Sequence, residues 1–150
     1  MSGDFERDGY RFVDVPGQLD PEWMTNAVLS SYWGGRLGRE QVRESLENAR
    51  LFGLLDQQGH QVGMARVVTD GTRFAWLSDV IIAENLRGRG LGQWMLGLIF
   101  GSAGLRRVDR WLLATGDGHD LYRRFGFVST DVDGKFMVRT AGSPGSMSVE

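Results

Sequence analysis

The sequence predicts a mixed α/β fold whose central sheet is mostly antiparallel but contains one parallel pair of strands. Two observations support this class. Apolar segments separated by turn residues follow one another in the middle of the chain, as in an antiparallel meander. The last of them, Phe74–Ile82, is joined by a helical segment to a further strand at Arg110–Ala114, and such a crossover makes two strands parallel. The expected order is β-α-α-β-β-β-α-β-α-β-β.

The N-terminal third is expected to hold one strand and two helices. Residues Tyr10–Val15 are rich in strand-forming side chains and are followed directly by a proline, which favours a short opening strand. Asp20 followed by proline is typical of a helix start, so the first helix is expected over Pro21–Ser30. The second helix is expected over Arg39–Arg50, where apolar residues recur at helical spacing among charged ones.

The middle of the chain is expected to form three consecutive strands. Leu51–Leu55 and Val62–Val68 flank the turn residues Asp56–Gly59 and therefore predict a hairpin. A second turn at Asp70–Gly71 leads into Phe74–Ile82, whose β-branched and aromatic residues are typical of a strand.

The C-terminal third alternates helices and strands. Leu91–Phe100 carries apolar residues at positions 91, 94, 95, 98 and 99, the spacing of one helical face. After the strand Arg110–Ala114, a short helix is expected over His119–Phe125, and a final strand pair around Phe127–Val128 and Phe136–Val138. These elements form a single expected domain over residues 1–139, followed by a tail at 140–150 that is expected to be disordered.

Composition excludes several classes of site. The 150 residues include no cysteine, which rules out disulfides, thiolate metal sites and a cysteine nucleophile, and only two histidines, so no metal is expected. The net charge of −2 argues against general nucleic-acid binding. The polar N-terminus and the lack of a long apolar run predict a cytoplasmic protein with no membrane partner. Either a monomer or a homodimer is compatible with the sequence.

The run Leu86–Gly92, between the expected strand and helix, is the strongest candidate for a ligand site. Its glycines allow the backbone to approach a ligand, and the start of the following helix presents N–H groups to an anion such as a phosphate. A P-loop is excluded, because its lysine and hydroxyl residue are missing. A dinucleotide fingerprint is excluded as well, because its third glycine would fall on Gln93 or Met95.

Two motifs carry a resemblance to a known family. Arg87, Gly90 and Gly92 fill the pattern Arg/Gln-x-x-Gly-x-Gly/Ala, and Leu121–Phe127 reads Leu-Tyr-x-x-x-Gly-Phe. With both motifs in this order, the chain resembles the GNAT superfamily of N-acetyltransferases over about Tyr10–Val138. The resemblance implies the acyl-CoA N-acyltransferase fold, with a parallel strand pair that splays apart.

The resemblance implies an acetyl-CoA-dependent enzyme. Such an enzyme moves the acetyl group to a primary amine of a small molecule or peptide, by direct attack in a ternary complex. Nothing in the sequence identifies the amine. The alternative is a non-catalytic acyl-CoA-binding sensor or regulatory module, which would keep the glycine loop and could dispense with Tyr122 and Asp79.

The resemblance also implies which residues bind acetyl-CoA. The pantetheine would lie between the splayed strands Phe74–Ile82 and Arg110–Ala114, and the pyrophosphate on the backbone of the glycine loop. Thr115 stands where many relatives carry an asparagine that binds the pantetheine or orients the site. The implied cofactor-binding residues are Ile81, Ile82, Arg87, Gly88, Arg89, Gly90, Leu91, Gly92 and Thr115.

Tyr122 matches the tyrosine that relatives are thought to use as the general acid at the thiolate, the alternative being a packing role. Asp79 is a carboxylate inside an apolar strand and is the candidate base, against a structural hydrogen-bond or ion-pair role. The face of the sheet to which the Asp79 side chain points stays open, because a bulge would reverse the alternation of side chains along the strand. The candidate residues of the acceptor pocket are Tyr32, Trp33, Arg66 and Phe136.

Overall fold

The structure is a computed structural model, and it describes residues 5–31, 36–130 and 134–141. The chain folds as two units, Met1–Thr115 and Gly116–Glu150. The first contains the sheet and three of the helices, and the second contains one short helix. Within the described residues, no helix is both long enough and apolar enough to cross a membrane.

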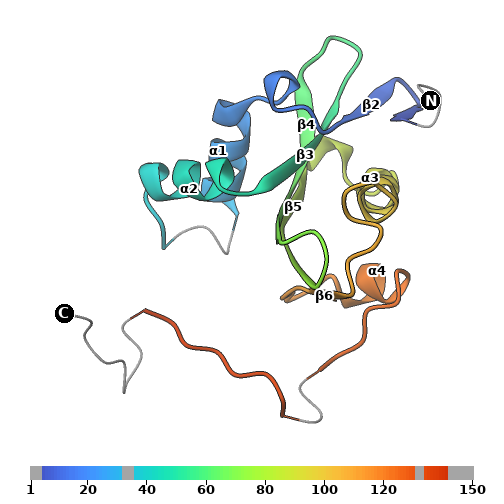
Figure 1. The fold of residues 1–150 in the computed structure, drawn as a ribbon. Coiled ribbons are helices and arrows are strands. Elements are labelled where there is room, and N and C mark those ends of the chain that lie inside the picture. Colours follow the sequence, from blue (N-terminus) through green and yellow to red (C-terminus); the bar gives the residue numbers. More distant parts are fainter. Residues whose placement is uncertain (1–4, 32–35, 131–133, 142–150) are drawn as a thin grey trace. The chain divides into compact units, whose positions relative to one another are not determined.

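The first unit is built on a six-stranded sheet in which the strands follow one another in chain order (Figure 1). Neighbouring strands are antiparallel except for the last two, which are parallel and joined through helix α3. The predicted mixed α/β class is therefore confirmed. The strands are β1 (Glu6–Arg7), β2 (Tyr10–Val13), β3 (Arg50–Leu55), β4 (Gln61–Thr69), β5 (Phe74–Ile82) and β6 (Arg110–Leu112).

Helices cover both faces of this sheet. α1 (Pro21–Ser30) and α2 (Arg39–Glu47) lie on one side, and α3 (Leu91–Phe100) lies on the other (Figure 1). The α1/α2 side is an apolar cluster that joins helical and strand residues, including Met24, Val28, Val42, Leu46, Val13, Leu55, Met64 and Ile81. Met64 and Ile81 are direct neighbours across β4 and β5, so this core reaches the strand that carries the candidate site.

The start of α1 is fixed by two side chains. The Asp20 carboxylate accepts a hydrogen bond from the Trp23 backbone N–H at 3.1 Å, as predicted for an N-cap. The Asp20 backbone N–H in turn donates to Gln61 Oε1 at 2.6 Å, and Gln61 Nε2 donates to the Gly63 carbonyl at 3.0 Å. Because Gln61 is the first residue of β4, these bonds tie the helix start to the sheet.

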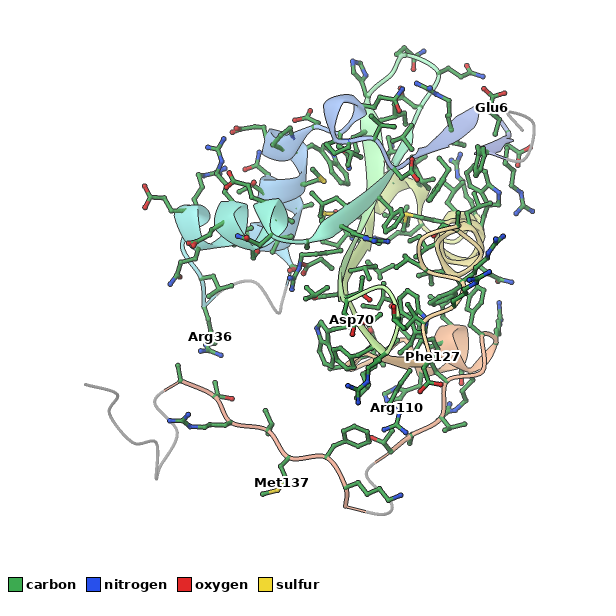
Figure 2. The ribbon with its side chains drawn as sticks, in the orientation of Figure 1. Glu6, Arg36, Asp70, Arg110, Phe127 and Met137 are labelled. Carbon is green, nitrogen blue, oxygen red and sulfur yellow. The ribbon has the colours of Figure 1, made fainter. Side chains whose placement is uncertain are left out.

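The β4–β5 turn confirms the prediction at Asp70–Gly71. The Asp70 carboxylate accepts from the backbone N–H groups of Thr72, Arg73 and Phe74, and these bonds, led by that from Thr72, lower the pKa of Asp70. Figure 2 shows Asp70 at the same end of the sheet as Arg110, the first residue of β6. Gly71 has φ +82°, a conformation that favours glycine.

Several boundaries differ from the predictions. α2 ends at Glu47, and Arg50 opens β3 instead of closing the helix, because it pairs with Val67 and its guanidinium donates to the Gly104 carbonyl. The first predicted strand ends at Val13, where the chain turns into a short 3-10 helix. The predicted strand Arg110–Ala114 stops at Leu112, and the predicted helix His119–Phe125 stops at Arg123. β1 was not predicted.

The expected strand pair around Phe127–Val128 and Phe136–Val138 is absent from the part of the second unit that the structure describes, residues 116–130 and 134–141. The side chains of Val128, Met137 and Val138 are exposed there. Apolar residues favour strands and indicate the face that they would bury. A short strand pair is stable only when further strands or a helix cover that face, and the local sequence does not show whether they do.

We expect Asp20→Ala to lower the free energy of unfolding by about 1 kcal/mol, because it removes the acceptor for the Trp23 N–H. Asp20→Asn is the matched control, since asparagine caps nearly as well and leaves the backbone bond to Gln61 in place. Urea denaturation measures both variants. Equal unfolding midpoints for Ala and Asn would show that the cap contributes nothing.

Candidate active site

The candidate site begins where the parallel strands part. β5 and β6 pair only at Phe74–Arg110, Ala75–Trp111 and Trp76–Leu112. β5 then continues to Ile82, whereas β6 ends at Leu112. Pairing with β4 persists along this stretch, so the second half of β5 is held in the sheet from one side. This geometry agrees with the predicted splaying of the two strands.

A bulge interrupts the pairing of β5 with β4 in this same stretch. Met64 pairs with Ile81 and Arg66 pairs with Ser78. Between these two pairs β4 contributes Ala65 alone, whereas β5 contributes Asp79 and Val80. Two residues opposite one define a β-bulge, which bends a strand and re-aims its side chains. The backbone of Asp79 accordingly has φ +53°, in the left-handed region.

The bulge joins two of the predicted site residues in an ion pair. Arg66 Nε donates to Asp79 Oδ2 at 2.8 Å, and Arg66 Nη2 donates to Ser78 Oγ at 3.2 Å. Asp79 is only 8% exposed, and the Arg66 side chain is 19% exposed. Arg66 lies two residues beyond Met64 on β4, so its side chain points to the same α1/α2 side of the sheet as that of Met64. This contact is the structural alternative to the role of Asp79 as a base.

Ser78 was not singled out from the sequence. The available signal was the pair Ser78–Asp79, two adjacent polar residues inside a strand that is otherwise apolar. Strict alternation places neighbours on opposite faces, so one of the two would have faced the apolar side without a partner. The bulge brings both within reach of the same guanidinium.

The glycine loop follows β5 through a short 3-10 helix, Glu84–Leu86, and ends at the first turn of α3. Gly88 has φ +81° and Gly90 has φ +79°, conformations that other residues adopt with strain. A Cβ on either glycine would meet no protein atom within 4 Å. Their backbone conformation, rather than a lack of space, therefore requires glycine at these two positions.

This loop presents the start of α3 to solvent. Gly90 precedes the helix and has no side chain to cap it, and the Trp94 N–H donates to the Gly90 carbonyl at 3.0 Å. Arg87, Gly88, Arg89 and Gly90 are exposed around this end. The Arg87 side chain donates from Nε to the Ile82 carbonyl at 3.0 Å and so fixes the loop at the end of β5. A helix start of this kind favours an anion.

The two isoleucines before the loop point to opposite faces. Ile81 is 8% exposed and belongs to the α1/α2 cluster. Ile82 is half-buried on the α3 side, where a Cβ on Gly92 would lie 3.7 Å from its Cγ1. Only Ile82 therefore presents its side chain toward the glycine loop, and the contribution expected of Ile81 falls to its backbone.

The second unit explains the spacing of the tyrosine motif. α4 (His119–Arg123) ends in a turn in which the Gly126 N–H donates to the Arg123 carbonyl and the Phe127 N–H donates to the Tyr122 carbonyl. Gly126 has φ +90°, as required for this type of helix end. The rings of Tyr122 and Phe127 meet edge to face, with centroids 5.9 Å apart. The glycine and phenylalanine of the motif thus cap the helix that carries the tyrosine.

The other predicted residues are distributed as follows. Thr115 is half-buried at the end of the first unit, and Phe136 is 46% exposed in the second unit. Tyr32 and Trp33 lie outside the described residues. Across residues 5–31, 36–130 and 134–141, no group of three or more His, Asp or Glu side chains is placed to hold a metal ion.

A cavity of about 660 Å³ also lies in the first unit, lined by residues of α1, α2, the start of β3 and the segment Ser102–Gly104. Its size suits a small molecule. None of the predicted site residues that the structure describes is in its lining. The segment Ser102–Gly104 follows α3, whereas the glycine loop precedes it, and a ten-residue helix separates its ends by about 15 Å. The cavity is therefore not part of the glycine loop, although its lining residue Leu51 pairs with Arg66 across β3 and β4.

Known proteins resemble this chain in sequence and in fold. A family model described as an acetyltransferase (GNAT) domain matches residues 47–129. A predicted acetyltransferase of the fungus Gibberella zeae is 32% identical over 118 residues, 65% of this chain and 67% of the fungal protein. The solved structure of a GNAT-family protein from Xanthomonas campestris, also a predicted acetyltransferase, has TM-score 0.82 at 26% identity, covering 90% of this chain and 95% of its own.

A GNAT family acetyltransferase from Elizabethkingia anophelis, solved with acetyl-CoA bound, has TM-score 0.64 at 17% identity. This likeness covers 83% of the present chain and 80% of the other. At that identity the comparison shows a shared fold.

Proposed function

The chain belongs to the GNAT acetyltransferase family, and we propose that it transfers the acetyl group of acetyl-CoA to a primary amine of a small molecule or peptide. The observation that carries this proposal is the glycine loop. It leads from the half of β5 that does not pair with β6 directly into the start of α3. A ligand that lies along β5 and ends in a phosphate group would meet that helix start.

We assign the pyrophosphate of acetyl-CoA to the turn from Arg87 to Gly92. Backbone N–H groups at the start of α3 and the partial positive charge of the helix favour a dianion, so no lysine is needed. Arg87 and Arg89 are exposed beside this turn and add positive charge. The acetyl-CoA complex of the Elizabethkingia protein, which shares the fold, supports the choice of donor.

We assign the pantetheine and the thioester to the stretch of β5 that β6 does not pair with. The bulge lies in this stretch. We assign its backbone N–H groups to the thioester carbonyl, where negative charge develops during the attack. The amine nitrogen forms a bond to the carbonyl carbon, the carbon–sulfur bond then breaks, and the thiolate of coenzyme A takes up a proton. The protonated amine gives up one proton, which passes to solvent, before the attack. Its nitrogen gives up a second proton as the tetrahedral intermediate collapses, and this balances the proton that the thiolate takes up.

Tyr122 is our candidate for the acid that protonates the thiolate. It is half-buried, and its ring is held against Phe127, so the phenol has a restricted orientation. Asp79 stays a predicted base, but its ion pair with Arg66 favours a different role, argued below. Thr115, Arg66 and Phe136 stay candidates for contacts with pantetheine or acceptor.

A non-catalytic acyl-CoA-binding module is the second candidate function. Such a module needs only the glycine loop and the open stretch of β5. It binds acetyl-CoA and releases no coenzyme A when amines are added, so one assay distinguishes it from the enzyme.

We expect the protein to release free thiol from acetyl-CoA in the presence of at least one amine. The panel covers polyamines, aminoglycosides, amino acids and peptide N-termini, and release without any amine gives the background. Acetyl-CoA binding is measured in parallel by thermal shift. Binding without release from any amine would support the sensor, and no binding at millimolar acetyl-CoA would overturn the proposed donor.

We expect Gly92→Leu to weaken acetyl-CoA binding at little cost in stability. A Cβ at this position makes only an ordinary 3.7 Å contact with Ile82, and leucine is a better helix former than glycine by up to about 1 kcal/mol. The motif admits glycine or alanine here, but a leucine side chain obstructs a pyrophosphate that approaches the backbone of the first turn. Gly97→Leu, on the exposed side of the same helix, is the matched control. Calorimetric affinities equal to those of the unchanged protein would place the pyrophosphate elsewhere.

We expect Tyr122→Phe to lower kcat for thiol release by about 10²-fold, the usual contribution of a general acid, with little change in the KM for acetyl-CoA. The substitution keeps the ring that packs on Phe127, so the helix end stays intact. Phe127→Leu tests the packing role separately, since it removes the ring contact and keeps the hydroxyl. An unaltered kcat in Tyr122→Phe would remove the tyrosine from the mechanism.

A further inference from the structure

We propose that the Arg66–Asp79 ion pair is a positioning device, which holds the β5 bulge so that its backbone N–H groups stay aimed at the thioester carbonyl. This inference rests on the proposed acetyl transfer. It gives both residues a role in the reaction without placing either of them in contact with the reacting atoms.

The backbone of Asp79 needs such support. With φ +53°, it occupies a region that L-residues avoid, although aspartate and asparagine enter it more readily than most. Asp8 is the only other non-glycine residue with positive φ in the described part of the chain, and it lies in the exposed turn between β1 and β2. Asp79 instead adopts this conformation inside a nine-residue strand, where the surroundings must impose it.

The side chain of Arg66 spans the irregular part of the strand. Its guanidinium donates to Asp79 through Nε and to Ser78 through Nη2, so one planar group from β4 fixes two consecutive residues of β5. These bonds supplement the register, since the backbone pairing of β4 and β5 is shifted between Met64 and Arg66.

The energetic cost of the pair argues for a role beyond packing. Asp79 is 8% exposed, and removing a carboxylate from water is unfavourable unless it is paired and hydrogen-bonded. Apolar side chains of similar size would fill the same space without that cost. What an apolar pair would not do is fix the direction of the backbone at the bulge.

The location makes that direction important. Past Trp76, β5 has no pairing with β6, so its backbone is held in the sheet through β4. A small displacement of the bulge would move its N–H groups away from the carbonyl oxygen. Misplacement by about 1 Å at a reacting centre costs on the order of 10²-fold in rate.

The test compares Asp79→Asn with Asp79→Ala. Asparagine keeps an oxygen for Arg66 Nε and tolerates positive φ, whereas alanine loses both properties. We expect kcat per folded enzyme to stay within about threefold in the Asn variant and to fall by about 10- to 100-fold in the Ala variant, with the KM for acetyl-CoA little changed in either. If Asp79 is instead the base, both variants lose activity alike.

Ser78→Ala provides a milder test that removes only the second bond of the guanidinium. We expect it to lower kcat by a few-fold and to leave the KM for acetyl-CoA unchanged. Arg39→Gln is the matched control, because it breaks the exposed Arg39–Glu22 ion pair at α1 and α2, away from the bulge. It should leave kcat as in the unchanged protein.

Nuclear magnetic resonance separates this inference from the proposed function. We expect the amide signals of Val80 and Ile81 to shift and to exchange faster with solvent in Asp79→Ala, and to change little in Asp79→Asn and Arg39→Gln. Unchanged signals in Asp79→Ala, or full activity of that variant, would overturn the positioning role. If the unchanged protein acetylates no amine, the proposed function fails, and the amide signals still decide whether the ion pair holds the bulge.

Discussion

The candidate active site depends on how β5 is held. Phe74, Ala75 and Trp76 pair with β6, and pairing with β4 begins at Ala75. From Leu77 onward, the described strands pair with β5 only through β4. A strand left open on one side offers backbone groups to a ligand, as binding by strand edges requires. The same opening removes half of the hydrogen bonds that would fix its conformation. The bulge, the ion pair and the Arg87 bond to the Ile82 carbonyl all act on this half-supported stretch.

Features that depend on neighbouring residues could be predicted from the sequence. The cap at Asp20 needs only the residue three positions later, and the predicted bounds of α1 agree with the structure. The glycine loop is similar, because the positive φ of Gly88 and Gly90 is a local requirement that few other residues meet. The parallel pairing of β5 and β6 followed from a helical crossover, which leaves few alternatives.

Features that depend on register could not be predicted. The direction of the Asp79 side chain is set by an extra residue in β5. The adjacent polar residues Ser78 and Asp79 indicate an irregularity, but the register with β4 that decides their direction is not contained in the sequence of β5. The ion pair of Asp79 needs Arg66, which is 13 positions away in another strand. The expected strand pair at Phe127–Val128 and Phe136–Val138 depended in the same way on a partner surface, and the described residues of the second unit show no strand there.

The two motifs that suggested the family differ in how far the structure alone explains their residues. In Leu121–Phe127, glycine and phenylalanine form a helix end, in which Gly126 supplies the positive φ and Phe127 folds back on the tyrosine ring. Such an end would suit any short helix, so these two residues indicate a structure and not a reaction. The helix end uses the ring of Tyr122, which packs on Phe127, so the proposed role of its hydroxyl is a separate question. In the loop, by contrast, Gly88 and Gly90 shape the turn itself, and their Cβ positions face open space in which a ligand can lie. The loop conformation therefore supports the proposed anion site, whereas the role proposed for the tyrosine needs kinetic evidence of its own.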